Sequence, residues 1–378
     1  MILYAIYSLS GHLLEYSGHL YSYAKSHPEK EFVFAFPVSG KKRLEELGIA
    51  GAPNVSIYFI DEKTADWILN TKNLLLKSYR YSKDLGRLVK LFAPDEIILI
   101  NLVSYLPFIV FFVGGKTKIR GIIYNIYLYS WKNSGLRFKF LNALMYTILA
   151  RFKCFDRLFV LNDEVSARLL NRLYSTRKFA GLPDPFNADV VAAGEDSSCD
   201  LSKYKRVFLH FGGLDYRKGT VDILDSIGFV PADLAKDFCF VFLGRVYDGM
   251  KEEFYRKAGE AAKKTNVLVF DKTSPLETVF HFFKNSDCVL IPYKNVNQSS
   301  GVLGYGAYFN KPVISGGRGL LGRLVKKNRL GLALDELTPE NLAAAYSSDL
   351  EAAIDCSCAN DYVKRNSVGP FLEKLFEK

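Results

Sequence analysis

Three glycine-rich segments in the second half of the chain have the composition of phosphate-binding turns. In the first, residues 210–219, two glycines follow a predicted strand, and Arg217 and Lys218 precede a predicted helix. Free backbone N–H groups at a helix N-terminus, together with a nearby cation, bind a phosphate group. Because Gly-Gly turns are common, this segment alone is a weak indication of such a site.

The second segment, residues 286–314, carries the strongest local signal. It predicts a buried strand, a polar loop, and a helix that begins at Ser299-Ser300-Gly301. Either serine can cap a helix without any ligand, but capping explains less well two serines, a glycine and a long polar loop at the carboxyl end of a strand. The third segment, residues 314–325, contains four glycines and is predicted to form a loop that closes over a ligand.

Histidines and cysteines give weaker indications of chemistry. His12 follows the first predicted strand in a glycine turn and is a candidate base, although a single loop histidine is more often structural. His210 ends a core-like strand and His281 lies in a predicted helix, so both are interpreted as structural. The six cysteines contain no Cys-x-x-Cys pair, and we expect reduced thiols. No Asp-x-Asp follows a predicted strand, and we therefore expect no metal site.

The composition is that of a folded protein with more than one domain. Of the 378 residues, 49% are hydrophobic and 24% are charged, which excludes disordered and collagen-like classes. No uncharged stretch reaches the roughly 18 residues that a membrane span needs. The longest apolar run, residues 102–115, is interpreted as a buried helix, and no signal peptide is predicted.

Short apolar strands alternate with helices through both halves of the chain. This pattern is typical of parallel sheets that are covered by helices on both faces. We therefore predict an α/β protein with two doubly wound parallel sheets, with helical runs between the strands, for example at residues 65–92. The strands are predicted at residues 2–8, 31–37, 54–60, 96–101, 119–126 and 157–161, and at 206–211, 238–244, 267–270, 288–292, 312–315 and 331–334.

A polar, proline-containing stretch at residues 181–205 is the predicted domain boundary. It separates an N-terminal domain, residues 1–190, from a C-terminal domain, residues 191–360, and a closing helix is predicted within residues 361–378. Ligands of such sheets bind beyond the carboxyl ends of the strands. The cleft between two facing domains is therefore the expected site.

The net charge of +10 is concentrated in the first half of the chain. Residues 1–190 carry +9, and nine Lys and Arg residues lie between Lys116 and Arg157 against Asp156 alone. Apolar residues recur in this stretch at helical spacing. Three interpretations stay open: a core-facing helix with solvated lysines, a helix on an anionic membrane surface, and nucleic-acid binding, for which no motif is present. The apolar positions are Phe138, Leu141, Met145, Ile148 and Phe152.

Residues 206–334 resemble the donor domain of GT-B glycosyltransferases, and most closely the retaining group called glycosyltransferase family four. The motifs follow the family order: a glycine turn with Lys-Gly, a strand ending in Leu-Gly, the strand Ser-Asp-Cys-Val-Leu-Ile-Pro, a helix ending before Lys-Pro-Val-Ile, and a glycine loop. The first half matches in outline, through its opening glycine turn, the RLFVLND strand and the GLPDPF segment. The resemblance implies two domains that face each other across a cleft and a C-terminal helix that returns to the first domain.

The resemblance also implies a nucleotide-sugar donor, with a UDP-sugar expected, in the C-terminal domain. Lys218 would contact the donor diphosphate, and residues 271–276 would lie near the nucleobase. The implied positions are Gly213, Arg217, Lys218, Ser299, Ser300, Gly301, Val302 and Leu303 for the diphosphate, Asn297, Gln298 and Tyr305 for the sugar or ribose, Arg245, Thr273, Ser274 and Pro275 for the nucleobase, Gly11 and His12 for the acceptor side, and His12 and Asn125 as catalytic candidates.

The sequence departs from the family pattern at several of these positions. Gly213 stands where the family usually has an arginine, and Asn125 stands in place of a histidine of the first domain. The paired glutamates of the family fall on Asn297 and Tyr305. Asn297, or Gln298 beside it, could hold sugar hydroxyls as a neutral hydrogen-bonding partner.

We therefore expect a glycosyltransferase of the hexosyltransferase type, retaining and independent of metal, whose acceptor is a lipid-linked or surface-polysaccharide glycan. The implied setting is bacterial capsule, O-antigen or exopolysaccharide assembly, in the cytoplasm or at the inner face of the cell membrane. Two alternatives are weighed. An epimerase would need carboxylates that the donor helix lacks. A catalytically silent GT-B protein, acting as partner of another glycosyltransferase, is favoured by the missing glutamates but not by the retained Lys218.

Overall fold

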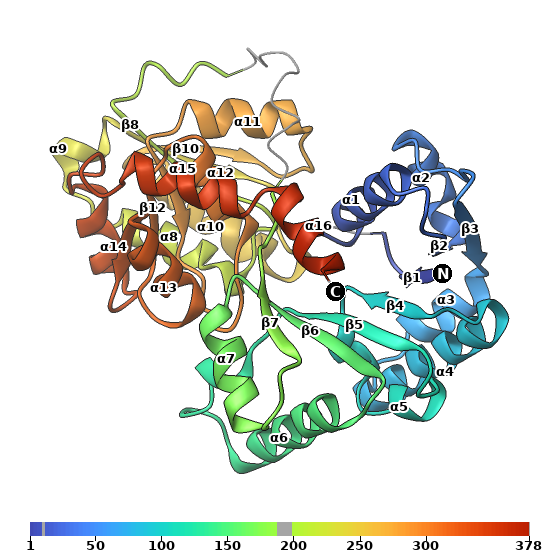
Figure 1. The fold of residues 1–378 in the computed structure, drawn as a ribbon. Coiled ribbons are helices and arrows are strands. Elements are labelled where there is room, and N and C mark those ends of the chain that lie inside the picture. Colours follow the sequence, from blue (N-terminus) through green and yellow to red (C-terminus); the bar gives the residue numbers. More distant parts are fainter. Residues whose placement is uncertain (10–11, 187–198, 378) are drawn as a thin grey trace. The chain divides into compact units, whose positions relative to one another are not determined.

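The computed structural model describes residues 1–9, 12–186 and 199–377, which form two compact units (Figure 1). Unit 1 comprises Met1–Leu182 and Phe371–Lys378, and unit 2 comprises Pro183–Pro370. The predicted boundary between residues 190 and 191 lies outside the described residues. Each unit is built around one parallel sheet, as the alternation of strands and helices predicts.

Unit 1 contains a seven-stranded sheet in the order β3-β2-β1-β4-β5-β6-β7. Successive side chains of a strand point to opposite faces of the sheet. In β1, Leu3 and Ala5 therefore join one buried cluster, while Tyr4 joins the other. The strands are β1 (Ile2–Ala5), β2 (Phe32–Pro37), β3 (Val55–Ile60), β4 (Glu96–Leu99), β5 (Lys118–Ile123), β6 (Phe155–Leu161) and β7 (Phe179–Leu182).

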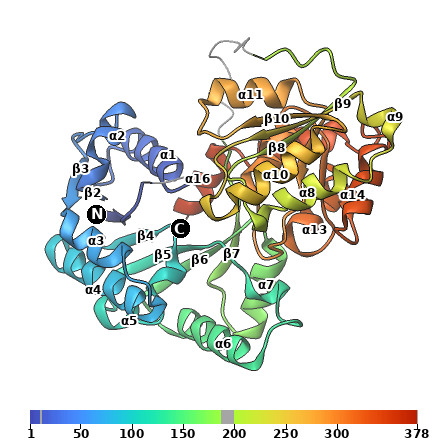
Figure 2. The ribbon, with the colours of Figure 1, turned by 180° about the vertical axis from the view of Figure 1, so that it is seen from behind.

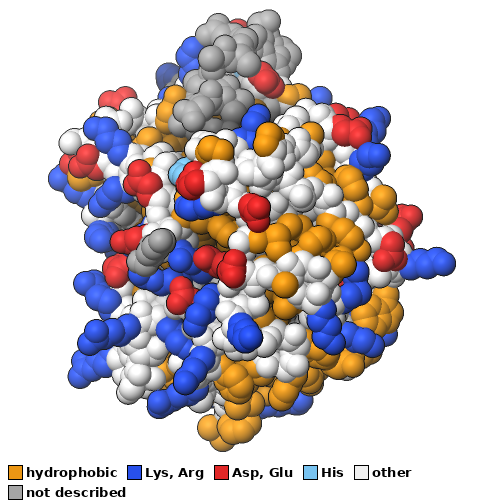
Figure 3. Space-filling model, turned by 45° about the vertical axis from the view of Figure 1, so that its right-hand side comes forward, with side chains coloured by type: hydrophobic (Ala, Val, Ile, Leu, Met, Phe, Trp, Pro, Cys, Tyr) orange, Lys and Arg blue, Asp and Glu red, His pale blue; other side chains and the backbone are white. Residues whose placement is uncertain are grey.

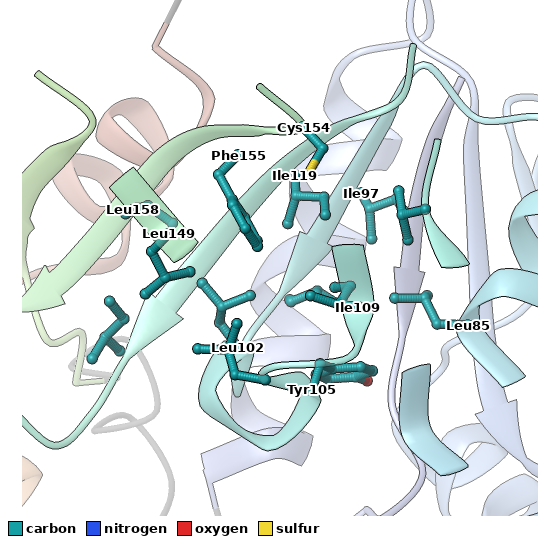
Figure 4. Close-up of a cluster of buried hydrophobic side chains, with 14 of the residues drawn as sticks. Leu85, Ile97, Leu102, Tyr105, Ile109, Ile119, Leu149, Cys154, Phe155 and Leu158 are labelled. Atoms are coloured by element: carbon teal, nitrogen blue, oxygen red, sulfur yellow. The ribbon is translucent and has the colours of Figure 1, made fainter. Parts of the chain in front are cut away.

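Helices cover both faces of this sheet. Those of unit 1 are α1 (His12–Ser26), α2 (Lys41–Glu46), α3 (Glu62–Leu69), α4 (Leu74–Phe92), α5 (Ile109–Phe112), α6 (Leu136–Arg151), α7 (Glu164–Leu173) and α16 (Val368–Phe376), with single turns η1 (Val38–Gly40), η2 (Leu102–Tyr105) and η3 (Tyr127–Tyr129). One cluster takes its helical residues from α3 to α7, and the other from α1, α2 and α16. Figure 4 shows part of the first cluster, where Leu85, Ile109 and Leu149 lie near strand residues such as Ile119 and Phe155.

Two local predictions for unit 1 are wrong, and one strand is missing from the prediction. Residues 65–92 form two helices, because Asn73 begins α4 by accepting a hydrogen bond from the Leu76 N–H. Residues 102–115 form η2 and α5, which are separated by Pro107, a residue that cannot continue a helix from the preceding turn. Strand β7 was not predicted, because Phe-Ala-Gly-Leu is short and has no β-branched residue.

Unit 2 contains a six-stranded sheet in the order β10-β9-β8-β11-β12-β13. Its helices lie on both faces, with α8 and α10 on the side toward the viewer in Figure 2. The strands are β8 (Arg206–Phe211), β9 (Phe238–Leu243), β10 (Asn266–Phe270), β11 (Cys288–Ile291), β12 (Val313–Gly316) and β13 (Gly331–Leu334), and the helical segments are η5 (Tyr216–Lys218), α8 (Thr220–Ile227), α9 (Ala232–Ala235), η6 (Asp248–Met250), α10 (Lys251–Ala261), α11 (Leu276–Lys284), α12 (Gly301–Tyr308), α13 (Gly319–Asn328), α14 (Pro339–Tyr346) and α15 (Cys356–Arg365).

The end of α16 is anchored in unit 1 by Arg120 of β5. The Arg120 guanidinium is 6% exposed and donates hydrogen bonds of 2.8 and 2.7 Å to the carbonyls of Leu375 and Glu377. Its Nε lies 2.5 Å from the Glu96 carboxylate. Last-turn carbonyls lack partners within a helix, so a cation that binds them holds the helix end in place. Leu375 is also fully buried in the core of unit 1.

Candidate functional site

The turn after β8 presents a lysine whose charge is not neutralised by a described carboxylate. Nζ of Lys218 lies 5.4 Å from the centroid of the Tyr293 ring, and among the described residues no Asp or Glu forms an ion pair with it. A Cβ at Gly212, which has φ of 108°, would lie 2.5 Å from Nζ of Lys218. Glycine at this position therefore leaves room for the ammonium group beside the strand end. The arrangement suits an anionic ligand.

The neighbouring Arg217 has a different environment. Its guanidinium donates to the Asp215 carboxylate at 2.6 Å, and its side chain is 69% exposed. Asp215 in turn accepts a hydrogen bond from the Lys218 N–H at 3.0 Å and so caps η5. Gly213, which follows Gly212 in this turn, is exposed. Of the two adjacent cations, Lys218 is the one available to an anion without breaking an existing ion pair.

Close backbone packing joins this turn to the end of β11. Gly219 has φ of 72°, a left-handed conformation, and a Cβ there would lie 2.4 Å from the carbonyl oxygen of Pro292. In addition, the N–H of Lys294, which follows β11, donates a hydrogen bond of 2.8 Å to the carbonyl of Arg217 in the turn after β8. The first and second predicted phosphate segments are therefore held next to each other in unit 2.

His210 helps to hold these two strand ends together. Its Nδ1 lies 2.8 Å from the Leu290 carbonyl and its Nε2 lies 2.9 Å from the Thr220 hydroxyl. A carbonyl can only accept, so the neutral ring donates from Nδ1 and accepts from Thr220 at Nε2. Burial is the main cause that lowers the pKa of His210 from 6.5 to about 4. Both ring nitrogens have structural partners, as the sequence predicted.

This shift predicts a loss of stability in mild acid. Between pH 6.5 and 4 the unfolded chain binds a proton at His210 that the folded chain does not, so the free energy of unfolding falls as the pH decreases, by up to about 1.4 kcal/mol per pH unit. Urea unfolding at several pH values measures the slope. His210→Gln should have a shallower slope over that window; equal slopes for the two proteins would contradict the assignment.

The N-terminus of α12 has no side-chain cap. Ser300 is its N-cap, with φ of −142° and ψ of 123°, but the serine side chain forms no capping hydrogen bond. The Ser300 hydroxyl instead lies 3.4 Å from the Tyr293 hydroxyl. The N–H groups of Gly301 and Val302 begin the helix and have no acceptor in a preceding turn. With the helix dipole behind them, these N–H groups favour an anion.

Among the other predicted diphosphate residues, Val302 and Leu303 could offer a ligand only their backbone groups, because their side chains are buried. Ser299 is half-buried in the preceding loop. The groups in unit 2 that suit an anion are therefore the Lys218 ammonium and the first N–H groups of α12, on the turns after β8 and β11, which pair directly in the sheet.

Tyr305 lies in an aromatic cluster. Its ring centroid is 5.5 Å from that of Phe283, 5.8 Å from Phe186, 5.9 Å from Phe280 and 6.5 Å from Phe211. The position where the family pattern has a glutamate is thus a packing site. Asn297 and Gln298 are half-buried in the loop before α12, where the Asn297 N–H donates to the Asn295 side chain at 2.9 Å.

The turns after β9 and β10 carry the predicted nucleobase residues. Arg245, Thr273 and Pro275 are exposed, whereas the hydroxyl of Ser274 is buried and forms no hydrogen bond with any described residue. A buried hydroxyl without a partner costs free energy, which a ligand that binds it would recover. The Asp271 carboxylate, in contrast, already has hydrogen-bond partners. It accepts hydrogen bonds from the Val246 N–H at 2.8 Å and from the Tyr255 hydroxyl at 3.0 Å.

A cavity in unit 2 involves residues that the sequence analysis described only as a closing loop. It has a volume of about 390 Å³ at the ends of β12 and β13. Gly316, Gly317 and Arg318 line one side, and Glu336 and Thr338 line another. The signal in the sequence was the glycine loop at residues 314–325, but nothing in it indicated that the chain after β13 forms the opposite wall.

In unit 1 the predicted residues are distributed over separate places. Gly11 lies outside the described residues, and His12 is the first residue of α1. Asn125 is exposed just after β5 and lines a cavity of about 530 Å³ together with Tyr124 and Asn101, which follows β4. This cavity lies where the carboxyl ends of two adjacent strands meet, the expected place for a ligand of a parallel sheet.

The basic stretch divides into a buried and an exposed part. Arg120 is buried and paired, so it is not part of a basic surface. The C-terminal half of α6 packs on the core through Tyr146 and Leu149. Its N-terminal half is exposed: Leu136 is 85% and Phe140 is 69% exposed, and apolar and basic side chains lie together near the lowest part of Figure 3. The core-facing interpretation therefore holds for only half of the helix. Exposed apolar residues of the other half also include Phe138 and Leu141.

The described parts of the chain show neither a cluster of metal ligands nor a membrane-spanning helix. Residues 1–9, 12–186 and 199–377 contain no group of three or more His, Cys, Asp or Glu side chains that could hold a metal ion. Over the same residues, no helix is both long and apolar enough to cross a membrane. All six cysteines are free thiols, and Cys356 is exposed.

Comparison with solved structures identifies the fold, although no family model and no curated protein matches the sequence. An α,α-trehalose-phosphate synthase (UDP-forming) from Burkholderia vietnamiensis has a TM-score of 0.72 with 12% identity over 99% of both chains. A glycosyltransferase from Rickettsia africae has a TM-score of 0.68 with 14% identity, over 100% of this chain and 96% of that one.

Two further similar structures are also sugar-transferring or nucleotide-bound proteins. WaaG, a glycosyltransferase involved in lipopolysaccharide biosynthesis, has a TM-score of 0.68 with 12% identity over 100% of both chains. HepE of Anabaena, in complex with UDP-glucose, has a TM-score of 0.68 with 14% identity over 100% of this chain and 98% of that one. The chain therefore has the GT-B fold, the fold of these glycosyltransferases.

Proposed function

We propose that the protein transfers a sugar from a nucleoside diphosphate sugar to a hydroxyl group of an acceptor. The observation that carries this proposal is the combination of the Lys218 ammonium and the uncapped N-terminus of α12 on adjacent strand ends of unit 2. Each favours an anion, and together they suit a diphosphate. The UDP-glucose complex of HepE supports UDP as the nucleotide.

In this proposal the diphosphate is also the leaving group. The bond between the anomeric carbon and the diphosphate oxygen breaks, a bond to the acceptor oxygen forms, and the acceptor proton passes to the leaving phosphate or to water. Negative charge accumulates on the diphosphate as the bond breaks. Lys218 and the N–H groups of α12 would stabilise this charge, with no step assigned to a metal ion. We propose retention of the anomeric configuration only because the sequence resembles the retaining family four.

Neutral groups are proposed to bind the rest of the donor. Asn297 and Gln298 would hold sugar hydroxyls from the loop before α12, since the Tyr305 position is a packing site. The buried hydroxyl of Ser274 would bind the nucleobase, beside Arg245 and the exposed Thr273. An amide both donates and accepts, so it can bind a hydroxyl without a charge.

The direct test is a binding panel of UDP, GDP, TDP, ADP and CMP and their sugars, with magnesium or with EDTA. A ligand at a hundred times its Kd should raise the free energy of unfolding by about 2.7 kcal/mol. We expect UDP and a UDP-sugar to bind in both conditions, and turnover to survive EDTA. If no nucleotide binds, the transferase proposal fails and a silent partner of another glycosyltransferase becomes the better interpretation.

We propose a lipid-linked glycan as the acceptor and an anionic membrane surface as the place of reaction. The exposed apolar side chains of α6 lie in the same segment as the exposed Lys132 and Arg137. Such a surface binds a membrane through burial of apolar area and attraction to anionic lipids, with each basic residue near the surface adding about 1 kcal/mol.

Flotation with vesicles tests this surface. The protein should float with vesicles that contain anionic phosphatidylglycerol at moderate salt, and less with vesicles of phosphatidylcholine alone. Phe140→Ser should reduce partitioning roughly tenfold, because a buried phenylalanine contributes about 1.5–3 kcal/mol. The matched control is Phe229→Ser, which replaces a phenylalanine of unit 2 that is 53% exposed. No flotation of the wild type, or equal losses in both variants, would contradict the α6 surface.

A further inference from the structure

Tyr293, which follows β11, contacts both of the turns that carry the groups suited to an anion. The centroid of its ring lies 5.4 Å from Nζ of Lys218, and its hydroxyl oxygen lies 3.4 Å from that of Ser300. Lys218 belongs to the turn after β8, whereas Ser300 is the N-cap of α12. Only 8% of Tyr293 is exposed. One buried side chain is therefore in contact with both parts of the candidate site.

The ring of Tyr293 can hold the Lys218 ammonium and still leave its charge available to a ligand. A cation beside an aromatic face is attracted by the quadrupole of the ring, which carries no net charge. A carboxylate partner, such as Asp215 beside Arg217, would instead neutralise the cation and compete with an incoming anion. The contact also restricts a long, flexible side chain before the ligand arrives, which reduces the entropy that binding has to remove.

The hydroxyl of Tyr293 draws the Ser300 side chain away from the start of α12. A serine at the N-cap usually accepts a hydrogen bond from an N–H group of the first helical turn. The Ser300 side chain forms no such bond, and its hydroxyl donates toward Tyr293 instead. The Leu303 N–H is bonded to the Ser300 carbonyl at 3.1 Å. The N–H groups of Gly301 and Val302, which precede it in the helix, are thus left for a ligand.

The Tyr293 backbone is fixed, but its side chain borders open volume. The Tyr293 N–H donates to the Ile291 carbonyl at 2.8 Å. The side chain, together with Val296 and Leu337, lines the cavity of about 390 Å³ at the ends of β12 and β13. A smaller side chain at this position would extend an existing cavity. A substitution should therefore affect the site more than it affects the folding of unit 2.

We propose that Tyr293 is a positioning residue for the donor diphosphate. Its ring holds Lys218, and its hydroxyl keeps the first N–H groups of α12 uncapped by engaging Ser300. The inference rests on the proposed function, and it adds to that site a residue that the sequence analysis did not single out. Tyr293 acts through Lys218 and Ser300 and makes no contact of its own with the ligand.

Tyr293→Phe tests the hydroxyl, because it keeps the ring. The released Ser300 hydroxyl should cap α12 and compete with the ligand, so UDP binding to the full chain should weaken about fivefold, the equivalent of one N-cap interaction. Calorimetry measures the affinity. The midpoint of thermal unfolding without ligand should not decrease, because the helix gains a cap. A merely structural role for the hydroxyl would instead lower the midpoint and leave UDP binding unchanged, which would overturn this part of the proposal.

A second pair of variants shows whether the hydroxyl acts through Ser300. Ser300→Ala and the double variant Ser300→Ala/Tyr293→Phe should bind UDP with the same affinity, because no serine hydroxyl remains for the tyrosine to engage. This comparison does not depend on any direct contact between Ser300 and the ligand. If Tyr293→Phe weakens UDP binding equally with and without the serine hydroxyl, the assigned route is wrong.

Tyr293→Leu tests the ring. It should bind UDP about three- to tenfold more weakly than Tyr293→Phe, the range of a lysine–aromatic contact. In the Lys218→Ala background the two variants should bind UDP equally, and a difference that persists there would overturn the role of the ring. The matched control is Tyr204→Leu, because the Tyr204 ring lies 5.1 Å from Nζ of Lys203 in another lysine–tyrosine pair of unit 2, before β8. It should leave UDP affinity unchanged.

Inorganic pyrophosphate, measured on the same proteins, separates this inference from the proposed function. If the wild type binds UDP and the Tyr293 variants bind it equally well, the inference fails and the transferase proposal stands. If the wild type binds pyrophosphate but no nucleotide, the transferase proposal fails, and the same ratios between variants, measured with pyrophosphate, decide the role of Tyr293. If the wild type binds neither, both fail.

Discussion

Lys218→Ala should weaken UDP binding by about 10- to 100-fold. A hydrogen bond or ion pair to a charged group contributes about 1.5–3 kcal/mol, and Lys218 is the ammonium group at the end of β8 that no described carboxylate neutralises. Calorimetry with UDP measures the loss directly. The effect on kcat should reach about 100-fold with a UDP-sugar, because the charge on the diphosphate increases as the glycosidic bond breaks.

Lys236→Ala is the matched control for this substitution. Lys236 is an exposed lysine of unit 2 that precedes β9, at the opposite edge of the sheet from the turns after β8 and β11. It should leave UDP affinity unchanged. Both variants should keep the wild-type midpoint of thermal unfolding without ligand, because neither lysine is in an ion pair with a described residue. If Lys218→Ala binds UDP as the wild type does, Lys218 is not a diphosphate ligand.

The elements of unit 2 could be predicted closely because its strands are short, mostly apolar runs. The predicted ranges 206–211 and 331–334 coincide with β8 and β13, and the other predicted strands of this half differ by one residue at one end or at both. Continuous apolar runs bounded by glycine or proline identify such strands without any tertiary information. Register and strand order, in contrast, depend on contacts between distant segments and came from the structure.

The site could be predicted in part, where backbone conformation depends on residue type. The positive φ of Gly212 and Gly219 and the uncapped start of α12 at Ser300 agree with the predicted turns. The sequence could not show which charged side chains already form ion pairs within the protein. Arg217 and Lys218 are adjacent and chemically similar, but only Arg217 pairs with Asp215.

Aromatic and apolar residues were the hardest to interpret from the sequence. Tyr305 was a candidate for binding sugar or ribose because of its position in the motif, but it lies among four phenylalanine rings. Leu74 and Leu75 gave no signal, because an apolar residue at a helix start can be either core or surface. In the structure both leucines are exposed and line a cavity together with residues of η2 and residues just after β5, which are distant in the sequence.

Arg120 shows that a basic residue can add to the net charge of the sequence without adding to the positive charge on the protein surface. The sequence placed it in a basic stretch with Lys116 and Arg157, but its guanidinium is buried between the Glu96 carboxylate and the carbonyls that end α16. Removing one member of a buried ion pair leaves the other charge without compensation, which costs about 3–5 kcal/mol. The two freed carbonyls add to this cost.

Arg120→Met should therefore lower the free energy of unfolding of unit 1 by about 3–5 kcal/mol, as measured by urea denaturation. Protein that remains folded should float with anionic vesicles as the wild type does, because the guanidinium is not on the surface. Arg137→Met, at the exposed start of α6, should show the reverse: unchanged unfolding, within about 0.5 kcal/mol, and weaker flotation. Similar stability losses in the two variants would contradict the structural role of Arg120, and unchanged flotation of Arg137→Met would contradict the contribution of that residue to membrane binding.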